Sequence, residues 1–215
     1  MQKLKVVFFG SSKFVIPIIE ILQKNFDLSL VFTTERLASQ GETLQTPVVK
    51  YCIKYKIPYL SVQQFNNLTI QQLKKSNPSL GILADFGVII PEEILNIFPK
   101  GIINIHPSLL PKYRGPSPVQ TAILNGDKET GVSIIKLDEE VDHGPILAQV
   151  KEPILENDTS ESLYDRLFRL GSSSIVRTIE LYLNGKITPR EQDHSKVTFT
   201  KSLTRQDGFV DLHIH

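Results

Sequence analysis

An amide and an imidazole stand two residues apart near the middle of the chain, in the run Gly-Ile-Ile-Asn-Ile-His-Pro over residues 101–107. The apolar residues around them predict a short buried strand that ends at Pro107, which lacks a backbone N–H. Because side chains alternate between the two faces of a strand, Asn104 and His106 project to the same side. Both can hydrogen-bond an oxygen that becomes negative when a carbonyl group is attacked.

Such chemistry needs a third group that takes or orients a proton, and the sequence downstream supplies candidate carboxylates. Asp138 and Asp142 lie in a predicted loop between two strand-like runs, residues 131–137 and 145–150. An Asn-x-His pair is also typical of a capping pair at a strand end. The pair alone therefore leaves a structural and a catalytic interpretation open.

The elements that must position these groups follow from the hydrophobic pattern. Strands are predicted over residues 4–9, 28–33, 80–84 and 101–105, and helices over residues 14–22, 48–55, 63–75 and 118–124, with a short helix opened by Pro91. This alternation implies parallel strands joined by right-handed crossovers. The expected fold is α/β with an open, doubly wound, mostly parallel sheet. Ligands of such sheets bind beyond the carboxyl ends of strands, and six residues fall there: Gly10, Thr33, Asp85, Asn104, His106 and Asp142.

The end of the chain predicts one long helix and an extended tail. Asp158 or Thr159 is expected to cap the helix, and Asn184-Gly185 to end it. The apolar stripe of this helix is interpreted as core. Residues 197–200 predict one further strand, and residues 208–211 the start of a connector.

Composition indicates a soluble enzyme and excludes several other classes. The chain has 215 residues, a formal net charge of +1 and one cysteine, Cys52. It has no apolar run of membrane-spanning length, no secretory leader and no transit peptide, so a cytoplasmic protein of bacterial type is expected. One cysteine excludes an internal disulfide framework. No metal site is predicted, because His213 and His215 lack acidic or cysteine partners.

One long motif turns the interpretation toward catalysis. The run Asn-Ile-His-Pro-Ser-Leu-Leu-Pro over residues 104–111, followed by Asp142 in a loop, resembles the signature of the folate-dependent formyltransferase family. The continuation over residues 112–120 and the run 125–132 are similar to its methionyl-tRNA formyltransferase branch. The resemblance extends from about residue 4 to about residue 211. It implies a formyltransferase domain over residues 1–190, with residues 191–215 forming a terminal strand and the start of a connector to a second domain absent from the chain.

The resemblance also implies a mechanism and a formyl donor, 10-formyltetrahydrofolate. Asn104 and protonated His106 would stabilise the negative formyl oxygen, while Asp142 would keep the imidazole charged and pass the proton of the amine toward the leaving nitrogen. Asp85 and Phe86 stand where the family more often has Ala and Tyr. The implied donor-binding residues are Ile82, Leu83, Ala84, Asp85, Phe86, Gly87, Val88, Ser108, Leu109, Leu110, Pro111, Asp138, Glu139 and Val141, with Ser108 expected to bond backbone.

The implied acceptor is initiator methionyl-tRNA, bound by a monomer that releases tetrahydrofolate. The loop over residues 34–45 holds one Arg and two Glu where the family has several basic residues, so weak RNA binding is expected. A small amine (an amino-sugar nucleotide or glycinamide ribonucleotide) and a non-catalytic folate-binding role remain as alternatives. Gly10 is interpreted as permitting a tight turn. The implied acceptor-binding residues are Gly10, Ser11, Ser12, Phe14, Arg36 and Arg114.

Overall fold

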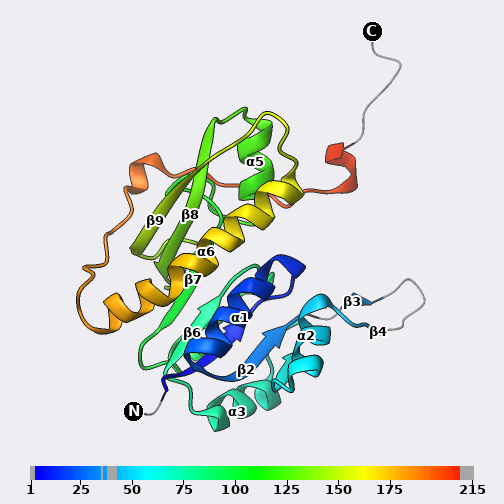
Figure 1. Ribbon diagram of the computed structural model, residues 1–215, viewed down its shortest axis with the longest axis vertical. Coiled ribbons are helices and arrows are strands. Elements are labelled where there is room, and N and C mark those ends of the chain that lie inside the picture. Colours follow the sequence, from blue (N-terminus) through cyan, green and yellow to red (C-terminus); the bar gives the residue numbers. More distant parts are fainter. Residues whose placement is uncertain (1–2, 35, 38–42, 209–215) are drawn as a thin grey trace.

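Seven strands of the chain pair into one mixed sheet. The computed structural model describes residues 3–34, 36–37 and 43–208. The sheet order is β5-β2-β1-β6-β7-β8-β9, in which the first five strands are parallel and β8 and β9 are antiparallel (Figure 1). The predicted α/β fold with a mostly parallel open sheet is confirmed. The strands are β1 (Lys5–Phe9), β2 (Asp27–Thr33), β5 (Tyr59–Ser61), β6 (Leu80–Leu83), β7 (Ile102–His106), β8 (Glu129–Lys136) and β9 (Ile146–Pro153).

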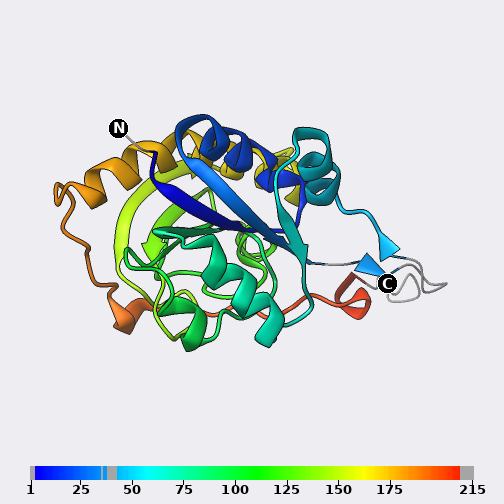
Figure 2. The same ribbon diagram turned by 90° about the horizontal axis from the view of Figure 1, so that it is seen from below.

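Helices cover both faces of this sheet. The central strand β1 is apolar over residues 6–9 because it is buried on both faces. Val6 and Phe8 pack into one core cluster, on the side of α1, α2 and α6, whereas Val7 and Phe9 pack into another beneath α3 and α4 (Figure 2). A strand buried on both faces reads as a continuous apolar run. The helices are α1 (Ile16–Asn25), α2 (Pro47–Tyr55), α3 (Asn67–Ser76), α4 (Glu92–Leu95), α5 (Pro118–Leu124) and α6 (Ser160–Leu183).

None of the helices in the described ranges is long and apolar enough to cross a membrane.

The structure differs from the sequence prediction at the edge strand β5, at α3 and in the loop that follows β2. No strand is predicted over residues 59–61, where β5 forms. Helix α3 begins at Asn67 instead of residue 63, because Asn66 and Thr69 form a reciprocal capping box there. The segment predicted as a loop over residues 34–45 contains a short antiparallel hairpin of β3 (Arg36–Leu37) and β4 (Thr43–Leu44). Residues 35 and 38–42 of that loop, and residues 209–215 of the predicted connector, lie outside the described residues.

The strand predicted over residues 197–200 does not form. In its place the described residues show one isolated parallel bridge, between Phe199 and Arg114. The facing loop turns on both sides of Arg114, since Tyr113 has φ 63° and Gly115 has φ 105°. A regular ladder needs several extended residues in succession on both strands, and this loop offers one.

Helix α6 packs directly against the strand that carries the Asn-x-His pair. As predicted, Thr159 caps the helix, and its hydroxyl accepts from the backbone N–H of Ser162. The predicted apolar stripe is buried in the core. Gly171 allows the close approach, since a Cβ there would lie 2.7 Å from Ile105 Cγ2. The helix thereby holds β7 from behind.

The start of α6 is tied down by a partly buried ion pair whose loss should be measurable. Arg166 donates to both carboxylate oxygens of Asp158 at 2.9 and 2.6 Å, and this holds the pKa of Asp158 well below its usual range. A lowered carboxyl pKa in the folded state stabilises the protein above the unfolded value, about 3.9, and the contribution disappears as pH falls. Asp158→Asn is expected to lower the free energy of unfolding at neutral pH by about 1–2 kcal/mol.

Urea denaturation of both proteins at neutral pH and at about pH 3 measures this linkage. The difference between them should shrink in acid. A difference that stays constant with pH would contradict the proposed origin of the stabilisation.

Candidate active site

The carboxylate of Asp142 joins Asn104 and His106 in one cluster. Asn104 Nδ2 donates to Asp142 Oδ1 at 3.1 Å, and His106 Nδ1 lies 3.4 Å from the same oxygen. The second oxygen, Oδ2, accepts from the backbone N–H of Gly115 at 2.8 Å. Asn104, His106 and Asp142 are only 5%, 5% and 9% exposed, so little water competes for these bonds. The three residues singled out from the sequence therefore meet in space.

The sheet topology explains this meeting. Strand β7 lies between β6 and β8, and its Ile103 and Ile105 point into the core on one face. Alternation places Asn104 and His106 on the other face, as the sequence predicts. Asp142 arrives from the loop between the antiparallel strands β8 and β9.

The ring of His106 is oriented by a backbone carbonyl. His106 Nε2 lies 2.9 Å from the carbonyl oxygen of Tyr113, which can only accept, so Nε2 carries a hydrogen. The other nitrogen, Nδ1, then faces Asp142. Both oxygens of Asp142 already accept N–H groups, which suits an ionised carboxylate. A proton on Nδ1 would complete an imidazolium–carboxylate pair.

Backbone strain gathers around this cluster. Three non-glycine residues with positive φ border it: Asp85 (48°), Tyr113 (63°) and Asp142 (49°). The two others among the described residues, Lys56 and Asn77, have an ordinary explanation, since they end helices α2 and α3. Strained conformations persist where the surrounding structure enforces them, and they are common at functional sites.

Two adjoining hollows open onto the cluster. The larger, a cavity of about 270 Å³, has apolar walls that include Leu83, Val88 and Leu137 and a rim of carboxylates from the loop over residues 138–142. The smaller, about 190 Å³, is bordered by aromatic side chains. Both are lined by Leu83, Gly87, Asn104, Gly115, Pro116 and Asp142. A reacting atom at the shared wall would be reachable from either side.

The expected donor-binding residues divide into groups. Six line the larger hollow: Leu83, Gly87, Val88, Asp138, Glu139 and Val141. Asp85 and Phe86 line the smaller one. Ile82 and Ala84 line neither, because both are completely buried in the core.

The second part of the expected donor set, residues 108–111, also lies away from both hollows. Ser108 is fully buried, and its hydroxyl donates to the carbonyl of Lys112 at 2.6 Å, the backbone bond predicted for it. Leu110 and Pro111 line neither hollow, and the Leu110 side chain packs in a small core cluster. Leu109 lines a separate pocket. These contacts show that the motif supports β7, and its binding of the donor stays a prediction.

The turn after β1 adjoins the smaller hollow through one aromatic contact. Phe14 stacks on Tyr164, a residue that lines this hollow, with ring centroids 5.3 Å apart. Ser11 accepts from the backbone N–H of Thr34, and Ser12 caps the short 3₁₀ helix over residues 13–15. Gly10 has no positive φ. It is required instead by a close approach, since a Cβ would lie 2.6 Å from the carbonyl oxygen of Ala84.

Of the two arginines expected to bind the acceptor, Arg36 lies in β3 and its contact stays a prediction. Arg114 is placed differently. Its side chain is 3% exposed and lines neither hollow, and its Nε and Nη2 donate to Gln192 Oε1 at 3.2 and 2.8 Å. Nη2 also lies 2.9 Å from His194 Nδ1. Its guanidinium packs against the C-terminal segment in this structure, and a contact with the acceptor stays a prediction.

Sequence reasoning missed the aromatic wall of the smaller hollow. Tyr164 and Phe168, four residues apart on α6, line it and stack with centroids 5.6 Å apart. Burial, with a further contribution from the charge of Asp85, raises the pKa of the Tyr164 hydroxyl above its usual range. The helical spacing was visible in the sequence. Only the docking of α6 across the sheet reveals which end of the stripe reaches the hollow.

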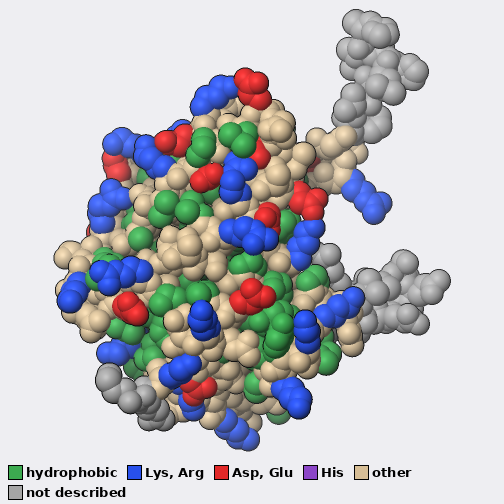
Figure 3. Space-filling model, in the orientation of Figure 1, with side chains coloured by type: hydrophobic (Ala, Val, Ile, Leu, Met, Phe, Trp, Pro, Cys, Tyr) green, Lys and Arg blue, Asp and Glu red, His purple; other side chains and the backbone are tan. Residues whose placement is uncertain are grey.

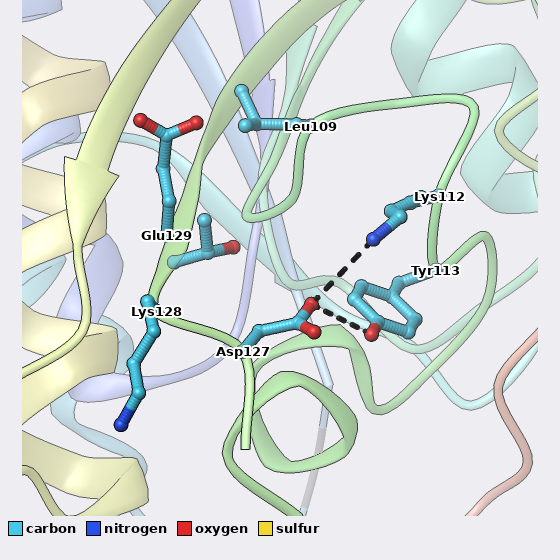
Figure 4. Close-up of a pocket in the computed structure, with 7 residues that line it drawn as sticks. Leu109, Lys112, Tyr113, Asp127, Lys128 and Glu129 are labelled. Atoms are coloured by element: carbon cyan, nitrogen blue, oxygen red, sulfur yellow. Dashed lines mark hydrogen bonds and ion pairs between the residues drawn. The ribbon is translucent and has the colours of Figure 1, made fainter. Parts of the chain in front are cut away.

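A separate pocket is lined by Tyr113, the residue whose carbonyl orients His106 (Figure 4). It has a volume of about 430 Å³ and is lined by Leu109, Lys112, Tyr113, Asp127, Lys128, Glu129 and Thr130. The Tyr113 hydroxyl donates to Asp127 Oδ2 at 2.8 Å and accepts from Asn125 Nδ2 at 3.0 Å. Its side chain is thereby anchored while its carbonyl contacts the imidazole.

Comparison with known proteins agrees with this geometry. Residues 4–179 match the family described as formyl transferase. The chain belongs to the formyl transferase family. A methionyl-tRNA formyltransferase from Roseiflexus sp. (strain RS-1) is 40% identical over 213 residues, which cover 97% of this chain and 66% of that protein. The chain thus spans about two thirds of the length of such relatives.

Solved structures share the fold at lower identity. Glycinamide ribonucleotide transformylase 1 from Symbiobacterium toebii superposes with a TM-score of 0.72 at 21% identity, covering 89% of this chain and 93% of that chain. An N-formyltransferase from Helicobacter canadensis, in complex with folinic acid and dTDP-3-aminofucose, gives 0.71 at 23% identity, covering 95% and 72%. These likenesses establish that the sheet described above is the formyl transferase fold.

No group of three or more His, Cys, Asp and Glu side chains within residues 3–34, 36–37 and 43–208 is arranged to hold a metal ion.

In this formyl transferase, Tyr113→Phe removes only the hydroxyl that anchors the ring. Burial raises the pKa of this phenol, although the Asn125 bond opposes the shift. A raised phenol pKa stabilises the fold below the unfolded value, about 10, and this contribution disappears as pH rises through the folded value. The substitution should lower the free energy of unfolding at neutral pH by about 1 kcal/mol, as measured by urea denaturation. An unchanged stability would show that Asp127 and Asn125 do not anchor the ring.

Proposed function

We propose that the chain is the catalytic unit of a methionyl-tRNA formyltransferase. The reaction transfers the formyl group of 10-formyltetrahydrofolate to the amino group of methionyl initiator tRNA. The observation that carries the proposal is that Asn104, His106 and Asp142 meet in one cluster, and that Asn104 and Asp142 lie in the wall between two hollows. The name of the relative that is 40% identical supports the choice of acceptor.

The larger hollow suits the flat heteroaromatic ring of a folate. Such a ring needs apolar surfaces on its faces and hydrogen-bond acceptors for its ring N–H groups. Leu83, Val88 and Leu137 supply the surfaces, and the loop over residues 138–142 supplies carboxylates and carbonyls. Gly87 has φ 75°, and a Cβ there would meet no atom within 4 Å, so its bare backbone faces the hollow. The Helicobacter canadensis enzyme was solved with folinic acid, a formyl folate.

Asn104 is assigned to the developing negative charge. The amine of the acceptor attacks the formyl carbon, and charge accumulates on the formyl oxygen. One hydrogen of Asn104 Nδ2 is used by Asp142, which leaves the other for that oxygen. A donor fixed in a buried site stabilises the transition state more than the ground state, where the oxygen is neutral.

His106 and Asp142 are assigned to charge and proton balance. His106 Nδ1 lies 3.4 Å from Asp142 Oδ1, which is long for a charge-assisted hydrogen bond. When Nδ1 carries a proton, it can therefore turn to the formyl oxygen as that oxygen becomes negative. Asp142 accepts the proton that the amine releases, directly or through water. The same proton then reaches the nitrogen that leaves the formyl carbon, so that one N–C bond forms while the other breaks.

A small amine is the second candidate acceptor, and the charge distribution favours it. The whole chain has a formal net charge of +1, and the loop over residues 34–45 holds one Arg and two Glu. On the face shown in Figure 3, Lys and Arg side chains are dispersed, with Asp and Glu among them. Phosphate contacts supply much of the affinity for RNA. A protein that only binds folate, by contrast, does not need the buried cluster of Asn104, His106 and Asp142.

Asn104→Ala should lower kcat about 10²–10³-fold, the usual effect of losing one oxyanion donor. Formyl transfer is followed with 10-formyltetrahydrofolate, and the melting temperature confirms folding. Asn184→Ala, at the exposed end of α6, is the matched control and should keep normal turnover. A folded Asn104→Ala protein with nearly normal kcat would refute the assignment.

The acceptor is tested by offering methionyl initiator tRNA, glycinamide ribonucleotide and amino-sugar nucleotides in parallel. Formylated methionyl-tRNA is expected, and it should be missing with Asn104→Ala. The affinity for tRNA should depend only weakly on salt, with a logarithmic slope of about −1 to −2, because few basic residues reach the RNA. Transfer to a small amine alone would replace the tRNA proposal by the second candidate.

A further inference from the structure

Gln192 is a buried amide whose hydrogen-bonding capacity is fully used. It is 4% exposed. Its Nε2 donates to the backbone carbonyls of Asp142 and Gly144, both at 2.8 Å. Its Oε1 accepts from Nε and Nη2 of Arg114 at 3.2 and 2.8 Å. An amide has two N–H hydrogens and two acceptor lone pairs, and all four have partners.

The segment around Gln192 contacts both the loop that carries Asp142 and the loop that carries Tyr113 and Arg114. At one end, Arg190 and Ile146 exchange backbone bonds of 2.9 and 2.8 Å. At the other, the Thr198 hydroxyl accepts from the N–H of Tyr113 at 2.8 Å, and Thr200 N donates to the carbonyl of Arg114 at 2.7 Å. In Figure 2 this segment is the orange-to-red chain on the lower side of the sheet.

The loop that carries Asp142 is held from the opposite side as well. A Cβ on Gly144 would lie 1.9 Å from the carbonyl oxygen of Lys136, so the loop is packed tightly against the end of β8. Asp142 itself has φ 49°, a conformation that a non-glycine residue keeps only under constraint. Gln192 closes the constraint, because it bonds the carbonyl of the strained residue.

A second contact joins the same two segments. His143 stacks on His194 with ring centroids 4.4 Å apart, and Asp138 Oδ2 lies 2.6 Å from His143 Nδ1. Arg114 can only donate, so the His194 Nδ1 that faces it accepts and carries no hydrogen. The two contacts lie close together, because His143 stands between Asp142 and Gly144, and His194 is two residues after Gln192.

We propose that Gln192 is a positioning residue for catalysis. It fixes the backbone of Asp142 so that the carboxylate reaches Asn104 and His106 together. Residues 192–200 thereby act as part of the catalytic unit, although they lie beyond α6. This inference rests on the proposed formyl transfer for its kinetic test, and on the geometry of Asp142 for an independent one.

Two substitutions separate the halves of the amide. Gln192→Met keeps the size and removes all four bonds. Gln192→Glu keeps the oxygens that face Arg114 and adds a favourable charge, but it removes the N–H groups that hold Asp142 and Gly144. If Gln192 acts through Asp142, both variants lower kcat about 10–100-fold, the usual effect of losing a supporting contact.

A merely structural role predicts another pattern. Both variants would then lose stability while kcat, measured below their melting temperatures, stayed normal, and this result would overturn the proposal. Gln149→Met is the matched control, because this glutamine also bridges segments, through Leu110, Ser133 and Arg190, but contacts nothing in the Asp142 loop. It should lose stability without losing kcat.

The N–H of Gly115 reports the position of Asp142 without any turnover, because it donates to Oδ2 at 2.8 Å. Its hydrogen exchange, measured by NMR, should accelerate at least about tenfold in both Gln192 variants and stay unchanged in Gln149→Met. Unchanged exchange would overturn the positioning role even where kcat falls. If the wild type transfers formyl to no acceptor, the proposed function fails, and the exchange result alone decides the role of Gln192.

Discussion

A single carboxylate must face an amide and an imidazole at once, and the rest of the site depends on this constraint. Asp142 Oδ1 meets Asn104 and His106, while Oδ2 is held by the N–H of Gly115. Burial makes each bond strong and makes any unpaired partner costly. The carboxylate therefore has to be placed by the backbone rather than by its own side-chain freedom.

The switch from parallel to antiparallel pairing provides that backbone. Parallel strands β6 and β7 carry the Asn-x-His pair, and β8 runs back along β7 until Lys136 pairs with Ile103. The loop to β9 then brings Asp142 against Asn104. The connecting loop is only as long as residues 137–145. Its strained Asp142 is held between β8 and Gln192, so rigidity is supplied on both sides.

Two hollows that share one wall suit a transfer reaction between two substrates. A donor in the larger hollow and an acceptor in the smaller one would both reach Asn104 and Asp142. The apolar and aromatic walls offer few hydrogen bonds to water, which would otherwise compete with the amine for the formyl carbon. The same walls leave recognition of the remainder of a large acceptor to other surfaces.

The sequence by itself determined the strands and helices of the central sheet apart from β5, the shared side of Asn104 and His106, and the loop that supplies Asp142. Hydrophobic periodicity and the turn and helix-end signals of Pro and Gly act over only a few residues, so a local pattern can reveal these features. Tertiary structure decided the rest. It turned Arg114 inward, left residues 197–200 without a ladder, brought Tyr164 and Phe168 to the hollow, and set Gln192 against Asp142, which is far from it in the chain. These contacts depend on how segments distant in the chain dock, and local residue patterns carry no information about docking.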